Sequence, residues 1–264
     1  MIRSALASLG LGLRLSLAWR LDVLTRLLSG VVVLVLTGTL WTAVTDGRSE
    51  VAGRPGPELV AYAVMAWVVA RVSATPIDAE LGERTRTGAI VHDLLRPGSL
   101  VLHLWARDAG RAVIGVLTTA APLAVSGVLL FGVGLPHAPG AWVAAGLSLV
   151  LAHAVGVGLA LCVGVLGMRV GRADGLVHAK GVVVALLSGA LVPLDVYPET
   201  VCELARLLPF AALADAPADL LVRGIALEAA MPVLAGQAAW ALGLLALATL
   251  GVRSVQGHAV TQGG

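Results

Sequence analysis

Long apolar runs without charged residues divide the chain. Residues 27–45, 112–168 and 229–252 contain no Asp, Glu, Lys or Arg. A helix needs about 20 apolar residues to cross the hydrocarbon core of a bilayer. Each run is long enough to cross once, and the middle run is long enough to cross twice. The pattern therefore predicts an all-α polytopic membrane protein.

Turn residues and isolated charges divide these runs and their neighbours into six predicted spans. The sequence L-P-H-A-P-G at 135–140 breaks the long middle run into a hairpin. Arg71 near the end of the second span can extend to the interface, so that span is retained. The fifth run is short, and could cross the membrane or stop partway. We expect spans at about 27–44, 59–75, 112–134, 141–168, 177–194 and 231–251.

Three segments outside these spans have distinct patterns. Residues 1–26 mix arginines with leucines and predict a partly amphipathic helix in the interface. Residues 195–223 are apolar but carry charges and prolines, which predicts short helices that lie on the membrane or re-enter it. Residues 253–264 form a short polar tail. Key positions of the outer re-entrant segment are Pro193, Tyr197, Pro198, Pro209, Phe210 and Pro217.

The densest charge cluster lies at 76–97, between two apolar regions. Glu80 and Arg84 are four residues apart, the helical spacing at which opposite charges face each other. This favours a short amphipathic helix, which Gly88 would loosen or end. The segment is either a solvated loop between two spans or a docking helix through which a soluble partner moves the membrane part.

The predicted fourth span carries a stripe of small residues at a strict four-residue spacing. Such a stripe lets another helix approach closely, so we favour helix packing over a functional role. The stripe consists of Ser148, Ala152, Gly156, Ala160 and Gly164.

Composition agrees with a membrane protein, and charge distribution gives its orientation. Hydrophobic residues make up 58% of the chain and charged residues 13%. The segments 1–26, 71–111, 169–180 and 253–264 together carry a net charge of +7, and all the others carry −5. Basic loops stay in the cytoplasm, so both termini and the 76–97 segment should face inward. The preference for arginine over lysine indicates a bacterial source, and hence the cytoplasmic (inner) membrane.

Several kinds of chemistry are disfavoured by the residues. Lys180 is the only lysine, and no P-loop surrounds it, so the chain cannot hydrolyse ATP by that route. No acidic residue lies in the middle of a predicted span, which disfavours an ion-coupled transporter. For His153 we favour a packing or polar-contact role over a proton relay. A net charge of +2 gives no reason to expect a nucleic acid partner.

Two blocks of sequence resemble the permease subunits of type-2 ABC exporters, in particular the daunorubicin- and viologen-exporter-like group. The first is R-T-G-A-I-V-H-D-L-L-R-P at 86–97, similar to the cytoplasmic "G-x-(I/L)-x-x-x-L-L-R-P" segment of that family. The second is L-S-G-A-L-V-P-L-D-V-Y-P-E-T at 187–200, followed by L-L-P-F-A-A-L-A-D-A-P-A-D-L-L-V-R-G at 207–224. Asp195 departs from the pattern, since an apolar or aromatic residue is expected there.

The resemblance implies a single permease domain over 1–264, without a cofactor of its own, that exports a substrate when a separate ABC ATPase binds ATP and Mg. It also implies a second permease copy, either identical or a related paralogue, and contact with membrane lipid. The surface that couples to the ATPase is expected within 76–111. Its candidate residues are Glu80, Glu83, Arg84, Arg86, Gly88, Asp93, Leu95, Arg96 and Pro97.

Two rival functions remain open at this stage. A non-transport scaffold or assembly subunit of a membrane complex would explain the spans and the lack of catalytic groups equally well. It would leave the charged 76–97 segment and the second block of sequence, at 187–224, without a role. A secondary transporter comes third, and an enzyme last.

Overall fold

The structure, a computed structural model, describes residues 20–94 and 99–262. Among these residues, five helices or helix runs are long and apolar enough to cross a membrane. They are Val23–Thr45, Gly56–Arg86, Leu100–Phe131, Pro139–Val170 and Leu227–Gln256. This architecture agrees with the expected all-α polytopic membrane protein. Of the interfacial helix expected at 1–26, residues 1–19 lie outside the described residues, and the remainder begins helix α2 (Arg20–Thr45).

The fifth apolar run, for which the sequence allowed either a crossing or a helix that stops partway, forms a short helix. Its residues form α9 (Asp174–Leu187), a helix of 14 residues, which is shorter than the roughly 20 residues of a regular span. The helix stops because Gly189 takes a left-handed φ of 81°. Pro193, which lacks an amide hydrogen, follows four residues later.

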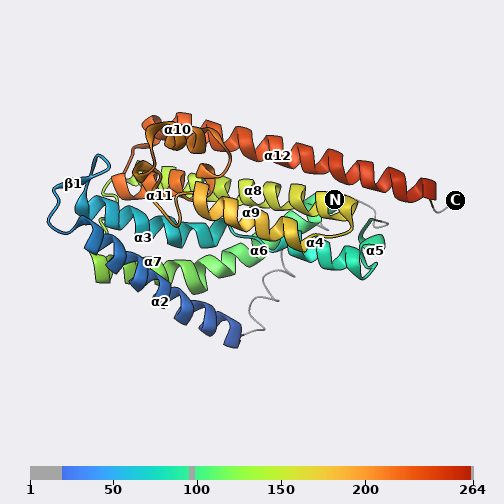
Figure 1. Cartoon of the computed structure of the whole chain (residues 1–264), viewed down its shortest axis with the longest axis horizontal. Helices are drawn as coiled ribbons and strands as arrows, with labels where there is room; N and C mark the ends of the chain where they lie inside the picture. The colour runs from blue at the N-terminus through green and yellow to red at the C-terminus, as the bar shows by residue number, and fades with distance from the viewer. Residues whose placement is uncertain (1–19, 95–98, 263–264) are drawn as a thin grey trace.

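Two helices form the centre of the bundle. In α3 (Gly56–Ser73) and α8 (Pro139–Val170), more than half of the apolar window is buried, against 22% in the outer spans. The fully buried Tyr62 and Met65 of α3 belong to the main core cluster. Helix α12 (Leu227–Gln262) packs along α8, while α2 lies against α3 (Figure 1).

A short hairpin joins α2 to α3 at one end of the bundle (Figure 1). Its strands β1 (Glu50–Val51) and β2 (Arg54–Pro55) are antiparallel, with Val51 opposite Arg54. The hairpin lies within residues 46–57, a loop that contains several glycines and prolines. It holds the Arg54 side chain in a buried position.

The third and last spans are longer than expected. Helix α6 (Leu100–Gly115) continues through a π-helix, η1 (Val116–Ala120), into α7 (Ala121–Phe131). Pro122 lacks the amide hydrogen that a regular α-helix would use there, and the wider π turn accommodates this. Helix α12 also continues to Gln262, so most of the polar tail expected at 253–264 is helical.

Four short helices follow α9 and precede α12. They are η2 (Leu194–Val196), α10 (Glu199–Leu207), η3 (Ala211–Leu213) and α11 (Asp215–Arg223). The positions singled out from the sequence lie mainly at their ends. Pro193, Pro198 and Phe210 precede η2, α10 and η3; Tyr197 follows η2; Pro209 lies between α10 and η3; Pro217 is buried in α11.

The small-residue stripe of α8 lies in the interior of the bundle, and all five of its residues are buried. A Cβ atom added at Gly156 would lie 2.1 Å from the carbonyl oxygen of Ser73, at the end of α3. One added at Gly164 would lie 2.6 Å from a Leu81 methyl group. The Ser148 hydroxyl donates a hydrogen bond of 2.8 Å to Gln237 of α12. The stripe thus brings α3, α12 and the residues after α3 against α8.

We predict that Gly156→Ala lowers the stability of the protein by about 1–3 kcal/mol, because the new methyl group overlaps a backbone oxygen that cannot move freely. Gly146→Ala is the matched control, since it lies on the same helix with no atom near its added Cβ, and its better helix propensity should leave stability equal or slightly higher. Thermal unfolding in detergent measures both. Equal melting temperatures for the two variants would contradict the close approach of α3 to α8.

Candidate functional site

The charged segment forms two helices at the end of the bundle opposite the hairpin (Figure 1). Residues 74–76 are not helical and separate α3 from helix α4 (Ile77–Arg86). Helix α5 (Ile90–Leu94) follows α4. Gly88, at the turn between them, has a left-handed φ of 74°. Helix α4 buries Ile77, Asp78 and Leu81 against α8, and exposes its opposite side to solvent.

Glu80 connects α4 to α6. Its two carboxylate oxygens accept hydrogen bonds from Arg107 and Arg111, one from each arginine. Arg111 also pairs at 2.6 Å with Asp108, whose side chain is almost fully buried. These charges are partly shielded from water, so their attraction is less screened than that of a surface pair.

A second buried ion pair connects α4 to α9. The Lys180 ammonium lies 2.5 Å from a carboxylate oxygen of Asp78, and the Asp78 side chain is only 2% exposed. Because an unpaired charge at such a depth is costly, the pair holds the start of α4 against α9.

Two further ion pairs join residues within α4 and α5. Arg84 pairs with Asp93 of α5, and Arg86 pairs at 2.7 Å with Glu83 on the exposed side. Glu80 and Arg84, expected to face each other from their spacing, thus have other partners. Leu95, Arg96 and Pro97 lie outside the described residues.

A second charge cluster lies at the hairpin end. The Arg54 side chain is 8% exposed and pairs with Asp195 at 2.6 Å and with Asp219 at 2.7 Å. Asp195 also accepts from Arg206 at 2.7 Å. Burial by itself lowers the pKa of Arg54, but Asp219 and Asp195 raise it above its ordinary value. Asp195, unexpected from the family resemblance, is therefore the bridge between the hairpin and α10.

Comparison with known proteins decides the family. Residues 31–255 match the family described as ABC-2 family transporter protein. The chain belongs to the ABC-2 transporter family. No curated protein and no solved structure matches it.

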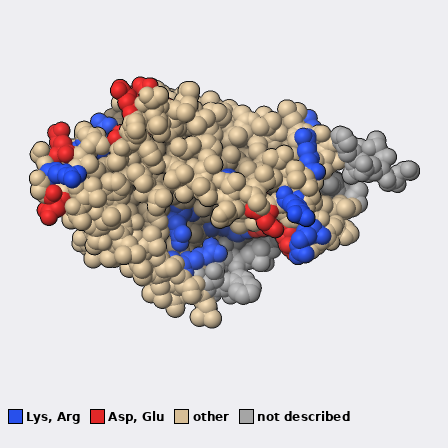
Figure 2. Space-filling model, in the orientation of Figure 1, with Lys and Arg blue, Asp and Glu red and all other residues tan. Residues whose placement is uncertain are grey.

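An ABC-2 transporter protein is the membrane component of an ABC transporter, and the family implies a partner ATPase. The arrangement of charge fits a multi-pass membrane component of this kind. On the face shown in Figure 2, charged side chains gather at the two ends of the long axis, and a hollow lined by basic groups lies between them. The rest of this face is largely uncharged.

The ionic connections of this ABC-2 protein could not have been found from the sequence. Lys180 lies about a hundred residues after Asp78, and Arg107 lies beyond the next loop from Glu80. The contact of His153 could not be found from the sequence either: its Nδ1 lies 3.2 Å from the carbonyl oxygen of Val72. The sequence showed only that charged residues lie beside apolar runs. It did not show which charged residues pair with each other.

We predict that Glu80→Gln loosens α4, because Arg107 and Arg111 then share a neutral amide instead of a carboxylate. Hydrogen–deuterium exchange of peptides within 77–86 should become faster. Stability should fall by about 1–3 kcal/mol. Glu83→Gln is the control, since Glu83 pairs only at the exposed surface and should change stability by less than about 1 kcal/mol. Identical exchange in both variants would contradict the proposed connection to α6.

We also predict that Asp215 makes stability depend on pH. Burial raises its pKa from 3.8 to about 6, although its hydrogen bond from Tyr62 and the nearby Arg206 lower it. The folded protein therefore keeps a proton that the unfolded chain releases. Its contribution to stability is complete below pH 3.8 and is lost as the pH rises through about 6.

Asp215→Asn should remove this dependence. The stability of the unaltered protein relative to the variant should fall by up to about 3 kcal/mol between pH 4 and pH 7. Melting temperatures across that range measure the difference. Asp46→Asn, in the exposed loop at the same end, is the control: its stability should differ from that of the unaltered protein by the same amount at every pH. If the stability of Asp215→Asn also differs by the same amount at every pH, the raised pKa is contradicted.

Proposed function

We propose that the chain is the permease of an ATP-driven exporter, and that α4 and α5 form the surface on which its ATPase docks. The observation that carries this proposal is a helix with one face exposed and the other joined by ion pairs to α6 and α9. ATP and Mg would bind on the partner, and this chain would provide the path across the membrane.

The exposed face of α4 has the chemistry of a docking surface for a soluble domain. Glu83 and Arg86 are 58% and 71% exposed at their side chains. Such charges at the rim of an interface steer a partner and fix its orientation. The resemblance over 86–97 extends this surface through Gly88 and Asp93 to Arg96.

The buried face of α4 gives a route for movement. Leu81 packs against Gly164 of α8, Glu80 binds two arginines of α6, and Asp78 binds Lys180 of α9. Packed interfaces of this type move as units and do not deform continuously. A push on the exposed face would therefore reach three membrane helices together.

We further propose that the segment after α9 completes a sixth crossing. Lys180 is held beside Asp78, just beyond the end of α3, while Asp195 is held beside Arg54, just before its start. The residues between them thus traverse the depth of α3, which is about 27 Å long for its 18 residues.

The irregular part of this crossing is covered by protein. The backbone amide of Asp215 donates a hydrogen bond of 2.9 Å to the carbonyl oxygen of Ser188. The Tyr197 hydroxyl donates one of 3.0 Å to the carbonyl oxygen of Leu186. Backbone that is not helical is tolerated at membrane depth when protein surrounds it in this way. Six crossings would put both termini on the same side as α4, and the charge distribution favours the cytoplasmic side for all three.

The direction and the assembly follow from the family resemblance. We propose outward transport of an amphipathic or lipid-like substrate along the interface between two permease copies of the daunorubicin- and viologen-exporter-like type. Exposed leucines along α12, including Leu242 and Leu250, offer an apolar face to lipid or to the second copy.

Purification of the tagged protein from its native membranes in a mild detergent tests the proposal. Mass spectrometry should identify a stoichiometric partner with a Walker A motif. Arg86→Glu should reduce recovery of that partner about tenfold, because like charges placed at an interface are costly. Arg48→Glu, in the exposed loop at the opposite end, should leave the recovery unchanged.

Two results would contradict the proposal. Equal recovery of the ATPase with both variants would exclude docking through the exposed face of α4. Absence of any P-loop ATPase, even after crosslinking in the membrane, would favour the alternative role as a scaffold or assembly subunit.

A further inference from the structure

The carboxyl group of Asp215, at the start of α11, is enclosed by protein on one side. Its side chain is 9% exposed, and the Tyr62 hydroxyl of α3 donates a hydrogen bond to it. The end of α9 packs against the same two residues. A Cβ atom added at Gly189 would lie 2.5 Å from the Tyr62 oxygen and 3.2 Å from the Cβ atom of Asp215. This close packing keeps water away from the carboxyl group on the side of α3 and α9.

The other side of Asp215 borders a cavity of about 480 Å³ between α10, α11 and α12. Asp215 lines the cavity together with Arg206 of α10 and with apolar residues of α12, among them Val233 and Trp240. A cavity of this size holds several water molecules. Any movement of α11 away from α3 would therefore bring the carboxyl group into contact with water from this cavity.

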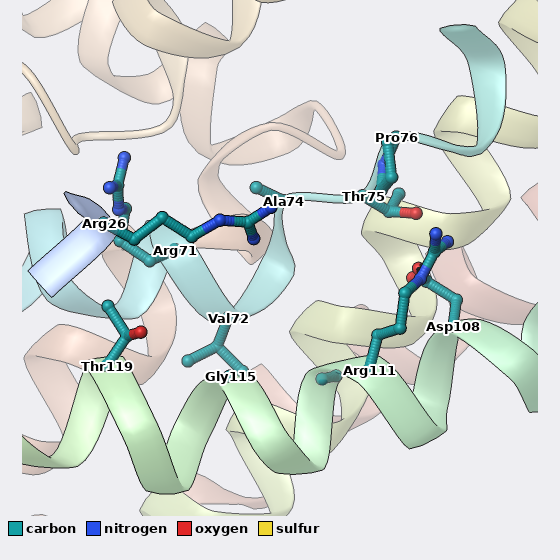
Figure 3. A pocket seen from close by; sticks show the side chains of 11 residues that line it. Arg26, Arg71, Val72, Ala74, Thr75, Pro76, Asp108, Arg111, Gly115 and Thr119 are labelled. Carbon is teal, nitrogen blue, oxygen red and sulfur yellow. Dashed lines mark hydrogen bonds and ion pairs between the residues drawn. The ribbon is translucent and has the colours of Figure 1, made fainter. Parts of the chain in front are cut away.

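The charge of Asp215 is only weakly compensated by a cation. The Nε atom of Arg206 lies 3.6 Å from its carboxylate, beyond hydrogen-bonding distance, and Arg206 instead donates a hydrogen bond of 2.7 Å to Asp195. Asp108, which lines a larger cavity between α2, α3 and α6, is different. It accepts hydrogen bonds of 2.6 and 3.1 Å from Arg111, and Figure 3 shows the two side chains together. Among the described residues, Asp215 has no such contact with an arginine.

The ion pairs of the hairpin end leave one negative charge in excess. Within the part of the chain that the structure describes, they join three arginines to four carboxylates: Arg54, Arg206 and Arg223 to Glu58, Asp195, Asp215 and Asp219. Burial raises the pKa of the nearby Cys202 thiol, so that thiol stays uncharged, and the Tyr62 hydroxyl acts as an uncharged donor. One proton on Asp215 therefore makes the cluster neutral.

A proton on Asp215 also favours the closed packing. Burial raises the pKa of Asp215 to about 6, although the hydrogen bond from Tyr62 and the charge of Arg206 lower it. In a state in which water from the cavity surrounds the carboxyl group, the pKa returns towards its ordinary value of 3.8. The closed state binds the proton more tightly, so the proton stabilises that state. This stabilisation is lost as the pH rises through about 6.

The short helices beside the cavity are suited to local movement. Helices α10 and α11 have nine residues each, too few to be stable by themselves in water. Helix α11 ends at Gly224, which has a left-handed φ of 61°. Segments of this kind open locally while the core of a protein stays folded.

We propose that Asp215 is a proton-binding site that controls access to the cavity between α10, α11 and α12. With the proton bound, α11 stays closed on Tyr62 and the end of α9. After the proton leaves, the buried charge favours a state in which α11 has moved and Asp215 contacts water in the cavity. The site lies at the opposite end of the bundle from the surface proposed for the ATPase, and it does not depend on that proposal.

Hydrogen–deuterium exchange of the purified full chain in detergent, corrected for the intrinsic effect of pH on exchange, tests the site. Peptides within 211–223 should exchange up to about 100-fold faster at pH 7.5 than at pH 4, because the pKa of the closed state exceeds the ordinary value by about two units and each unit is a tenfold effect. Peptides within α8 should stay better protected at each pH, because their exchange requires unfolding of the whole chain. Asp215→Asn should abolish the pH effect in 211–223, and Asp46→Asn, in the exposed loop at the same end, should keep it.

Labelling of a native cysteine gives a second test at a single pH. Cys202 of α10 is buried, and Cys162 would first be replaced by alanine. At pH 7.5, Asp215→Asn cannot ionise and should keep α11 closed. The reaction of Cys202 with a neutral maleimide should therefore be slower in this variant by about tenfold or more.

Several results would overturn the proposal. One is exchange within 211–223 that does not change across this pH range, and another is the same pH effect in Asp215→Asn. Equal protection of 211–223 and α8 would show that Asp215 is exposed only when the whole chain unfolds. Equal labelling rates of Cys202 in the two proteins would also overturn it. If Asp215→Asn does not fold, the comparison of 211–223 with α8 in the unaltered protein carries the test.

Discussion

The carboxylate of Glu80, shared between Arg107 and Arg111, is the interaction on which the arrangement of the end opposite the hairpin depends. Helix α4 has only ten residues, too few to be stable by itself in water. Its position is determined by this carboxylate, by the Asp78–Lys180 pair and by the burial of Leu81. Without them the segment after α3 would be a loop between two spans.

The hairpin end is also held by ion pairs, with different residues. Arg54 in the hairpin pairs with Asp195 of η2 and Asp219 of α11, and so joins the start of α3 to two of the short helices. Between the two ends the helices have almost no charge and are held by close packing, as where Gly156 meets α3. Charge thus fixes the ends of the bundle, and small residues set the distance between its central helices.

The sequence was sufficient for features that depend on local pattern. Charge-free length predicted four of the spans, and the break at 135–140 separated α7 from α8. The apolar run that ends near Arg71 predicted a fifth. Prolines and charges after α9 predicted the short helices within 195–223. Features that depend on contacts distant in sequence could not be predicted.

The ion pairs of Glu80 and those of Asp195 join elements that have no fixed spacing along the chain. For the fifth run the sequence left open whether it crosses the membrane or stops partway, because an apolar run does not show where its helix ends. The sequence identified 253–264 only as a polar tail, and gave no signal that α12 continues to Gln262.

The most direct test of the account is a distance measurement by pulsed electron paramagnetic resonance on the complex with its ATPase. Cysteines would replace Thr85 on α4 and Leu166 on α8, after removal of the two native cysteines, Cys162 and Cys202. Thr85 is chosen because it is not among the residues proposed to contact the ATPase. A second pair of cysteines, at Thr85 and at Leu36 on α2, would report that the complex has changed state when ATP is trapped. The account predicts that the distance from α4 to α8 stays constant while the distance from α4 to α2 changes. A shift of several ångströms between α4 and α8 would show that α4 moves by itself, and would contradict the account.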